Sequence, residues 1–135
     1  MSNFSIYVSH SIRGIKGKDA THEDMVANNK KAIVFGEELR HVFPDIDFYV
    51  PADNDEFVIV AYEKGYLDEQ EILAVDCAII DVRDMVLAWI PDQYVSNGMQ
   101  IEAIHAVTAG KPLATVRNIH DAQLVIDAVL ERRMG

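Results

Sequence analysis

Hydroxyl groups, glycines and cations are concentrated in one short segment, residues 9–18, near the start of the chain. The segment reads SHSIRGIKGK, in a chain with 12 Lys and Arg against 22 Asp and Glu residues and a formal net charge of -10. Glycine lets backbone N–H groups approach an anion closely, and an Arg guanidinium can bind a phosphate through two hydrogen bonds. The segment therefore predicts a local anion site with Ser11, Arg13 and Gly14 as candidates. A solvated loop whose cations only add solubility explains the same composition equally well.

A second polar segment precedes a predicted helix that begins near residue 98. Ser96, Asn97 and Gly98 are residue types that cap helices, and Glu102 follows about one turn later. Because a helix N-terminus favours negative charge, Ser96 and Gly98 are candidate anion contacts, and Glu102 would project towards whatever they hold. Taken by themselves, these residues are better explained as an ordinary cap with a first-turn acid.

The third candidate is an acid, Asp68, at the start of another predicted helix. It opens the run DEQE at residues 68–71, and such acids are common in any first helical turn. Two further acids, Asp76 and Asp81, bracket the strand predicted after this helix, and Asp81 lies at the carboxyl end of the strand, where ligand sites form. Either of them could simply cap a turn.

The apolar pattern predicts the elements that would position these residues. Runs of β-branched or aromatic residues predict buried strands at residues 4–8, 48–50, 77–82 and 112–116. Helical spacing predicts helices at residues 23–42, 66–75, 98–109 and 120–133. This alternation predicts a single-domain, doubly wound α/β fold, flavodoxin- or Rossmann-like, with a mostly parallel sheet and helices on both faces. Ligands of such sheets bind beyond the carboxyl ends of the strands.

Two stretches fit the alternation less well. Residues 56–62, EFVIVAY, suit either a strand or a buried helical turn, and we favour the helix. Residues 85–94, MVLAWIPDQY, are apolar, contain a proline and exceed the usual length of a connection. We interpret them as an inserted flap or a subunit contact. The contact predicts a homodimer, because exposed apolar patches usually mark interfaces and two-fold symmetry is the commonest way to bury one.

Composition limits the partners and the compartment. The acidic charge has the wrong sign for non-specific binding to nucleic acid or an anionic membrane, and no apolar run approaches the roughly 18 residues of a membrane span. A single cysteine, Cys77, favours a reducing compartment, with the cytoplasm as the default. The 5 histidines show no metal-ligand spacing with Cys77, so we expect no metal.

In their order and spacing, these segments resemble the nucleoside 2-deoxyribosyltransferase-like superfamily, and within it the nucleoside 5′-monophosphate N-glycosidases. IYV at residues 6–8 and SIRG at residues 11–14 are similar to the opening strand and phosphate loop of that family. Asp68 and VDCAII at residues 75–80 are similar to its helix with a catalytic Asp and the buried strand after it. Ser96-x-Gly98-x-x-x-Glu102 and the later GKP at residues 110–112 are similar to its nucleophile helix and next strand. The resemblance spans roughly residues 5–117.

The resemblance implies a role for each position. Glu102 would be the nucleophile, Asp68 the acid/base, and Tyr7 a first-strand residue near the nucleophile. The contacts to the 5′-phosphate would be Ser11, Arg13, Gly14, Ser96 and Gly98. The serine at position 96, where transferases acting on free nucleosides commonly have an aspartate, favours a phosphate-bearing substrate. Two departures touch the expected site: His10 replaces a residue that is usually a small glycine, and residues 85–94 lengthen a connection.

The implied activity is hydrolysis of the N-glycosidic bond of a (deoxy)nucleoside 5′-monophosphate. It would give the free base and (deoxy)ribose 5-phosphate through a covalent glycosyl-enzyme on Glu102, with no cofactor. Two carboxyl groups are what glycosidases use for such a reaction. Base exchange through the same intermediate and a non-catalytic nucleotide-binding module are the alternatives.

Overall fold

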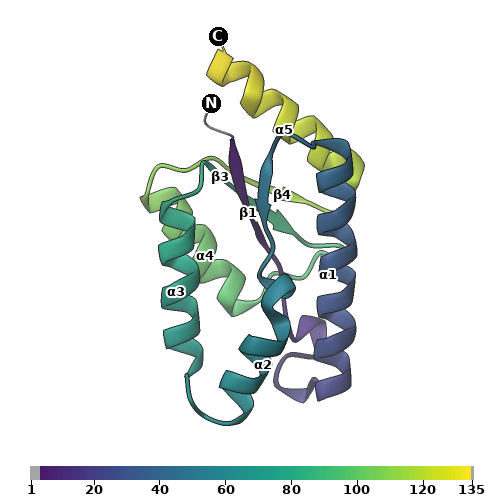
Figure 1. Cartoon of the computed structure of the whole chain (residues 1–135), viewed down its shortest axis with the longest axis vertical. Helices are drawn as coiled ribbons and strands as arrows, with labels where there is room; N and C mark the ends of the chain where they lie inside the picture. The colour runs from purple at the N-terminus through teal and green to yellow at the C-terminus, as the bar shows by residue number, and fades with distance from the viewer. Residues whose placement is uncertain (1–3, 135) are drawn as a thin grey trace.

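The centre of the protein is a four-stranded, wholly parallel β-sheet, seen in a computed structural model that describes residues 4–134 (Figure 1). The strands lie in the order β2-β1-β3-β4, and they are β1 (Ser5–Ser9), β2 (Asp47–Tyr49), β3 (Met85–Trp89) and β4 (Leu113–Val116). The predicted α/β class with a parallel sheet is confirmed. The strand β1 lies between β2 and β3, so the connection after β1 runs to one side of the sheet and the connection after β3 runs to the other. The loops at the carboxyl ends of β1 and β3 therefore diverge. Parallel sheets bind ligands at such a point.

Helices cover both faces of the sheet, as predicted. The helices α1 (His22–Val42) and α5 (Ile119–Met134) lie on one face, and α3 (Glu69–Asp81) and α4 (Asn97–Thr108) lie on the other (Figure 1). Three shorter segments lie beyond the carboxyl ends of the strands: the 3-10 helices η1 (Gly14–Asp19) and η2 (Pro51–Asn54), and α2 (Asp55–Glu63). Within residues 4–134, none of the helices is both long and apolar enough to cross a bilayer.

Alternation along β1 divides its side chains between the two helical layers. Ile6 and Val8 belong to the larger core, which α1 and α5 cover, whereas Tyr7 packs with residues of α3, β3 and α4. Successive residues of a strand point to opposite faces, so Ser9 shares the direction of Tyr7. Two hydroxyl groups of β1 therefore face the layer that contains α4.

Two predictions from the apolar pattern are wrong. Residues 77–82 are not a strand, because α3 runs through residue 81 and Val82 is its C-cap. Residues 85–94 are not one inserted connection, because Met85–Trp89 is the strand β3 and only residues 90–94 belong to the loop that follows it, where Tyr94 lines the pocket described below. This strand is buried on both faces between β1 and β4, and burial on both faces removes the polar alternation that would have marked it as a strand.

The helix predictions agree better with the structure. The segment 56–62 lies in α2, as we favoured. Thr21 is the N-cap of α1, and its side chain forms a capping box with Asp24. The helix expected at residues 66–75 begins later and continues further, as α3. Asp68 is the N-cap of α3 and forms a capping box with Glu71. The predicted helices 98–109 and 120–133 correspond to α4 and α5.

Candidate functional site

A buried carboxylate, Glu102, lies at the centre of the site. It is the sixth residue of α4 and only 5% exposed. The Tyr7 hydroxyl donates a hydrogen bond to its Oε2 atom at 2.6 Å, and the Ser9 hydroxyl donates to its Oε1 atom at 2.6 Å. Such short O–H···O distances are typical of an ionised acceptor, and the two bonds together fix the plane of the carboxylate. Alternation along β1 and the packing of α4 against the sheet thus orient one acid.

A second carboxyl group, that of Asp76 in α3, lies within hydrogen-bonding reach of Glu102 and Tyr7. Burial raises the pKa of Glu102 to about 7, the hydrogen bonds from Ser9 and Tyr7 oppose this rise, and the charge of Asp76 adds to it. Burial likewise raises the pKa of Asp76 to about 6. The two carboxyl groups titrate as a pair that shares a proton near neutral pH.

The two acids line a pocket of about 240 Å³ at the carboxyl ends of the strands. One group of lining residues is polar and comes from the loop after β1 and the start of α4: Ser11, Arg13, Gly14, Ser96, Asn97 and Gly98. Another group is apolar and comes from α1, α2 and α3: Met25, Val58, Ile59, Ile72 and Leu73. The pocket is therefore suited to a ligand with an anionic part and an apolar or planar part.

The loop after β1 has a defined shape that requires glycine. The Gly14 N–H donates to the Ser11 Oγ atom at 2.8 Å, and Gly14 has a φ of +68°. A Cβ atom at Gly14 would lie 2.8 Å from the Nδ2 atom of Asn28, a group that donates to the Ile12 carbonyl at 3.1 Å. Asn28 of α1 thus holds the backbone of the predicted anion loop against the pocket.

The start of α4 forms the opposite side of the polar region. The Ser96 Oγ atom accepts a hydrogen bond from the Met99 N–H at 3.2 Å and caps the helix. The N-terminus of a helix has a partial positive charge, and its first N–H groups have no partner within the helix. An anion at this end of the pocket is stabilised by both features.

The wall of the pocket next to β1 is fixed by a neutral histidine. His10 is buried, and its Nε2 atom accepts a hydrogen bond from the Ala52 N–H of η2 at 3.1 Å. Burial lowers the pKa of His10 to about 4, so the ring is uncharged at neutral pH. His10 therefore connects the loop after β1 to η2 and adds no positive charge to the pocket.

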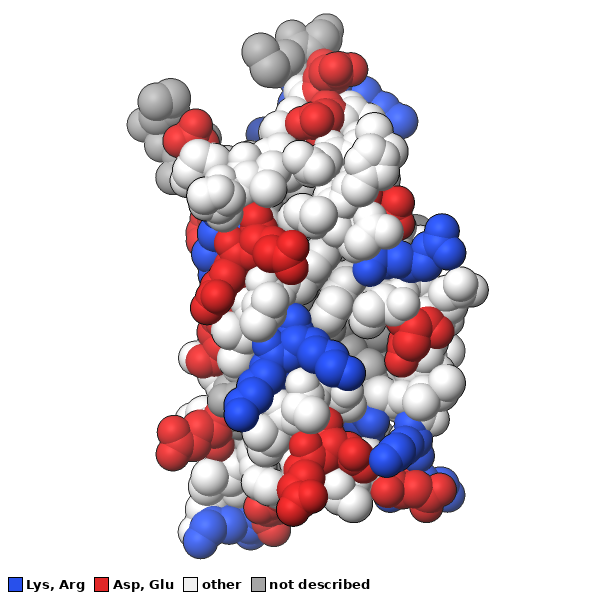
Figure 2. Space-filling view, turned by 90° about the vertical axis from the view of Figure 1, so that its right-hand side faces the viewer, with Lys and Arg blue, Asp and Glu red and all other residues white. Residues whose placement is uncertain are grey.

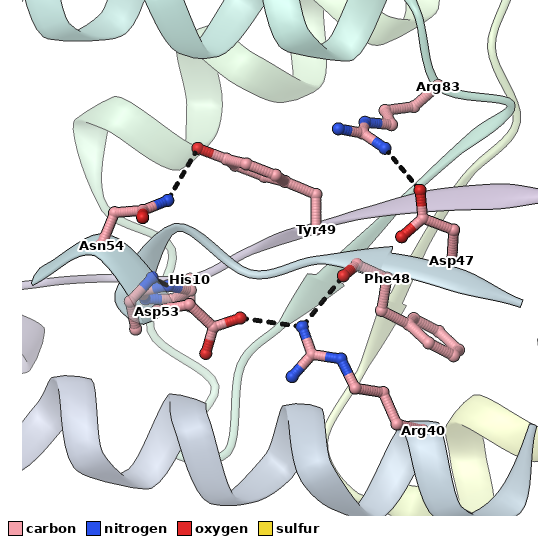
Figure 3. A network of polar contacts seen from close by, with 9 residues as sticks. His10, Arg40, Asp47, Phe48, Tyr49, Asp53, Asn54 and Arg83 are labelled. Carbon is pink, nitrogen blue, oxygen red and sulfur yellow. Dashed lines mark hydrogen bonds and ion pairs between the residues drawn. The ribbon is translucent and has the colours of Figure 1, made fainter. Parts of the chain in front are cut away.

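Polar contacts from two other elements hold β2 and η2 in place (Figure 3). Arg40 of α1 donates to the Phe48 carbonyl at 2.9 Å and to Asp53 at 2.8 Å, and Arg83 donates to Asp47 at 3.0 Å. Tyr49 of β2 stacks on the ring of Tyr7, with 5.6 Å between the ring centroids. The short edge strand therefore supports the tyrosine that binds Glu102.

The structure brings most of the predicted site residues together. Tyr7 contacts Glu102, and five other predicted residues line the same pocket as Glu102: Ser11, Arg13, Gly14, Ser96 and Gly98. Asp68 is not among the lining residues, and its Oδ1 atom accepts the Glu71 N–H at 2.7 Å as the cap of α3. Asp76 lies eight residues later, about 12 Å along the helix axis, and lines the pocket beside Glu102.

Two residues of the site were not predicted from the sequence. Ser9 could have been found, because it is two residues from Tyr7 on a predicted strand and must share its direction. Asp76 was seen only as the boundary of a strand, because residues 77–82 were misassigned. With α3 in place, Glu69, Ile72, Leu73 and Asp76 form one stripe at helical spacing along the pocket.

Among residues 4–134, no three His, Cys, Asp or Glu side chains lie close enough together to hold a metal ion. Comparisons of the chain with protein-family models, with curated proteins and with solved structures give no match. A function for this protein is therefore inferred from the residues that line the pocket.

Proposed function

We propose that this protein hydrolyses the N-glycosidic bond of a (deoxy)nucleoside 5′-monophosphate, releasing the free base and (deoxy)ribose 5-phosphate. The observation that carries the proposal is the buried Glu102, bound by two hydroxyl groups beside the second carboxyl of Asp76, in a pocket that also contains an anion loop and a helix N-terminus. Cleavage of a glycosidic bond proceeds through a transition state with positive charge at the anomeric carbon, and a pair of carboxyl groups is the usual means of catalysis.

In this reaction Glu102 attacks C1′ and the bond from C1′ to the base nitrogen breaks. Asp76 donates a proton to the departing base, and the sugar is left as an ester of Glu102. Asp76 then takes a proton from a water molecule, which attacks C1′ and releases Glu102. Asp76 lies within hydrogen-bonding reach of Glu102, whereas inverting glycosidases separate their two carboxyl groups by roughly 6.5–9.5 Å to admit a water, and this favours a covalent intermediate over direct displacement.

We assign the role of the acid to Asp76 and not to Asp68, because Asp76 lines the pocket and Asp68 does not. The shared proton must reside on Asp76 when the base departs. Positive charge at C1′ stabilises the ionised form of Glu102, and the hydroxyls of Tyr7 and Ser9 already donate to both of its oxygens. Tyr7 remains a donor, because burial and the nearby carboxylates raise its pKa well above 10.0.

The 5′-phosphate would bind at the polar region of the pocket, and the base would lie against the aliphatic residues of α2 and α3. Ser96 and Glu102 are separated by about 9 Å along the axis of α4, which leaves space for a ribose between the phosphate and the nucleophile. The scheme needs no metal or organic cofactor. We place it in the cytoplasm, because the single Cys77 suits a reducing compartment.

A chromatographic screen for released base tests the proposal. Ribo- and deoxyribonucleoside 5′-monophosphates are incubated with the protein, and the matching nucleosides serve as controls. Base should be released from a monophosphate, and the Glu102→Gln variant should lose this activity while it still binds the nucleotide, because the carboxylate acts mainly on the transition state. Glu131→Gln, which changes an exposed acid of α5, should behave like the wild type.

Two results would contradict hydrolysis as the function. Binding of monophosphates without release of base from any of them would identify a nucleotide-binding module. Formation of a new nucleotide when a second free base is added, in place of net hydrolysis, would identify a transferase that uses the same intermediate.

A further inference from the structure

Two parts of the pocket offer different hydrogen-bonding groups to a ligand. The loop after β1 and the start of α4 offer donors, which are hydroxyl, guanidinium and amide side-chain groups and the N–H groups at the N-terminus of α4. The helices α2 and α3 offer acceptors, because every polar residue among their described pocket-lining side chains is an acid: Glu63, Glu69 and Asp76. A ligand that spans the pocket therefore needs an anion at one end and hydrogen-bond donors at the other.

This separation of groups is a property of the pocket and not of the surface in general. Figure 2 looks onto the side of the molecule that α1 covers, where Lys and Arg side chains lie among Asp and Glu. In α1, the exposed Lys30 and Lys31 are followed about two turns later by the exposed Glu37 and Glu38. The helices α2 and α3 contain no Lys or Arg, so they supply no such cation to neutralise the acids that line the pocket.

Glu69 is the acid at the start of α3 that does not serve the helix itself. Asp68 and Glu71 form the capping box: the Asp68 Oδ1 atom accepts the Glu71 N–H at 2.7 Å, and the Glu71 Oε1 atom accepts the Asp68 N–H at 3.1 Å. Glu69 takes no part in this cap. Within the part of the chain that the structure describes, its carboxylate forms no hydrogen bond or ion pair, and it lines the pocket. Both of its oxygens can therefore accept hydrogen bonds from a ligand.

Glu69 also lies in line with the proposed acid, Asp76. The two residues are seven positions apart on α3, about 10 Å along the helix axis, and Ile72 and Leu73 line the pocket between them. A base that receives a proton from Asp76 would lie across these two aliphatic side chains, with the edge that points away from the sugar towards Glu69. A hydrogen bond of about 2.8 Å at each end would leave about 5 Å, which is the scale of a heterocyclic base.

Glu63 adds a second carboxylate to this part of the pocket. Its Oε1 atom lies 2.6 Å from the Nδ1 atom of His22, the first residue of α1, and this contact connects α2 to α1. One oxygen of Glu63 is therefore already engaged, whereas both oxygens of Glu69 are available. Glu69 is the acid placed to bind the base, and Glu63 makes the potential around the base more negative.

We propose that Glu69 selects nucleotides whose base has an amino group at the edge away from the sugar, an inference that rests on the hydrolysis proposed above. Cytosine and adenine have such an amino group, and it can donate to a carboxylate. Uracil and hypoxanthine have a carbonyl oxygen at the same position, and an oxygen with lone pairs repels the carboxylate. The N3–H of uracil does not compensate, because it lies between two carbonyl oxygens.

Matched pairs of nucleotides test this selectivity. CMP is compared with UMP and AMP with IMP, in ribo and deoxyribo forms, and release of base is followed by chromatography. The kcat/KM of the amino member should exceed that of its carbonyl partner by about ten- to a hundredfold, the range expected for a hydrogen bond to a charged group. In Glu69→Gln the ratio should fall to near one, because an amide accepts from an amino group and donates to a carbonyl oxygen equally well. Glu131→Gln, which changes an exposed acid of α5, should keep the wild-type ratio.

Calorimetric binding measures the same preference without turnover. In the Glu102→Gln background, CMP should bind more tightly than UMP, and adding Glu69→Gln should remove the difference. Release of base at equal rates from both members of each pair, or an unchanged ratio in Glu69→Gln, overturns the role of Glu69 and leaves the proposed hydrolysis intact. Failure to release base from any nucleotide instead refutes hydrolysis, and the binding of CMP and UMP then decides the role of Glu69, which equal binding overturns.

Discussion

Replacing Glu102 by glutamine should stabilise the fold while it abolishes release of base. Glutamine has the same shape as glutamate and cannot ionise. Its amide oxygen can accept a hydrogen bond from one of the two hydroxyls of Tyr7 and Ser9, and its NH2 group can donate to the other. The substitution therefore keeps the local contacts and removes a negative charge that is buried beside Asp76.

The magnitude follows from the pKa of Glu102, which burial raises from 4.5 to about 7, and such a shift corresponds to about 3 kcal/mol. The folded chain holds the proton more tightly than the unfolded chain. The stability of the wild type therefore falls as the pH rises between these two pKa values, and the full cost is present above the pKa of the folded state. Since Glu102 is 5% exposed, water screens this cost little.

Urea unfolding of the wild type and Glu102→Gln measures the effect. The variant should be more stable by about 3 kcal/mol near pH 8 and by less than about 1 kcal/mol near pH 5, where wild-type Glu102 is already protonated in the folded state. Glu131→Gln is the control for removing an exposed acid, and its effect should be small at both pH values.

The direction of the pH dependence tests whether burial of the ionised Glu102 destabilises the fold. A variant that is less stable than the wild type at the higher pH, or a difference that does not change with pH, would show that the carboxylate of Glu102 is not strained by burial. Retained base release in Glu102→Gln would separately refute its role as the nucleophile.

Three further predictions concern the proposed reaction. Asp76→Asn should prevent release of ordinary bases but spare a 7-methylguanine nucleotide, whose cationic base leaves without a proton; equal losses on both substrates would refute the acid role. The rate of base release by the wild type should be highest between about pH 6 and about pH 7, where the pair of acids holds one proton, and should fall on both sides; a flat profile over this range would contradict the shared proton. Arg13→Ala should lower the preference for a monophosphate over its nucleoside, measured as the ratio of kcat/KM values, by about 1.5–3 kcal/mol, and an unchanged ratio would remove Arg13 from the phosphate site.

Features that depend on neighbouring residues could be read from the sequence. The alternation of strands and helices predicted the parallel α/β fold, because short apolar runs and helical spacing are local patterns. Ser96 and Glu102 were correctly placed on one helix, since helical geometry alone relates a cap to a residue six positions later, although Glu102 lies beyond the first turn. Tyr7 and Ser9 must lie on the same side of β1 for a similar reason.

The tertiary structure decided which acid meets Glu102. Two apolar runs, residues 77–82 and 85–89, both fit a buried strand, and local periodicity cannot choose between them. The choice depends on pairing with β1, in which Ile6 lies opposite Met85, and on α3 continuing from its cap at Asp68 to residue 81. Once α3 extends this far, Asp76 lies beside α4 and Asp68 lies about two turns away, at the end of the helix. The contact joins Asp76 and Glu102, which are 26 positions apart in the sequence. Their helices, α3 and α4, lie side by side because both pack on the same face of the sheet, and no local sequence pattern encodes that packing.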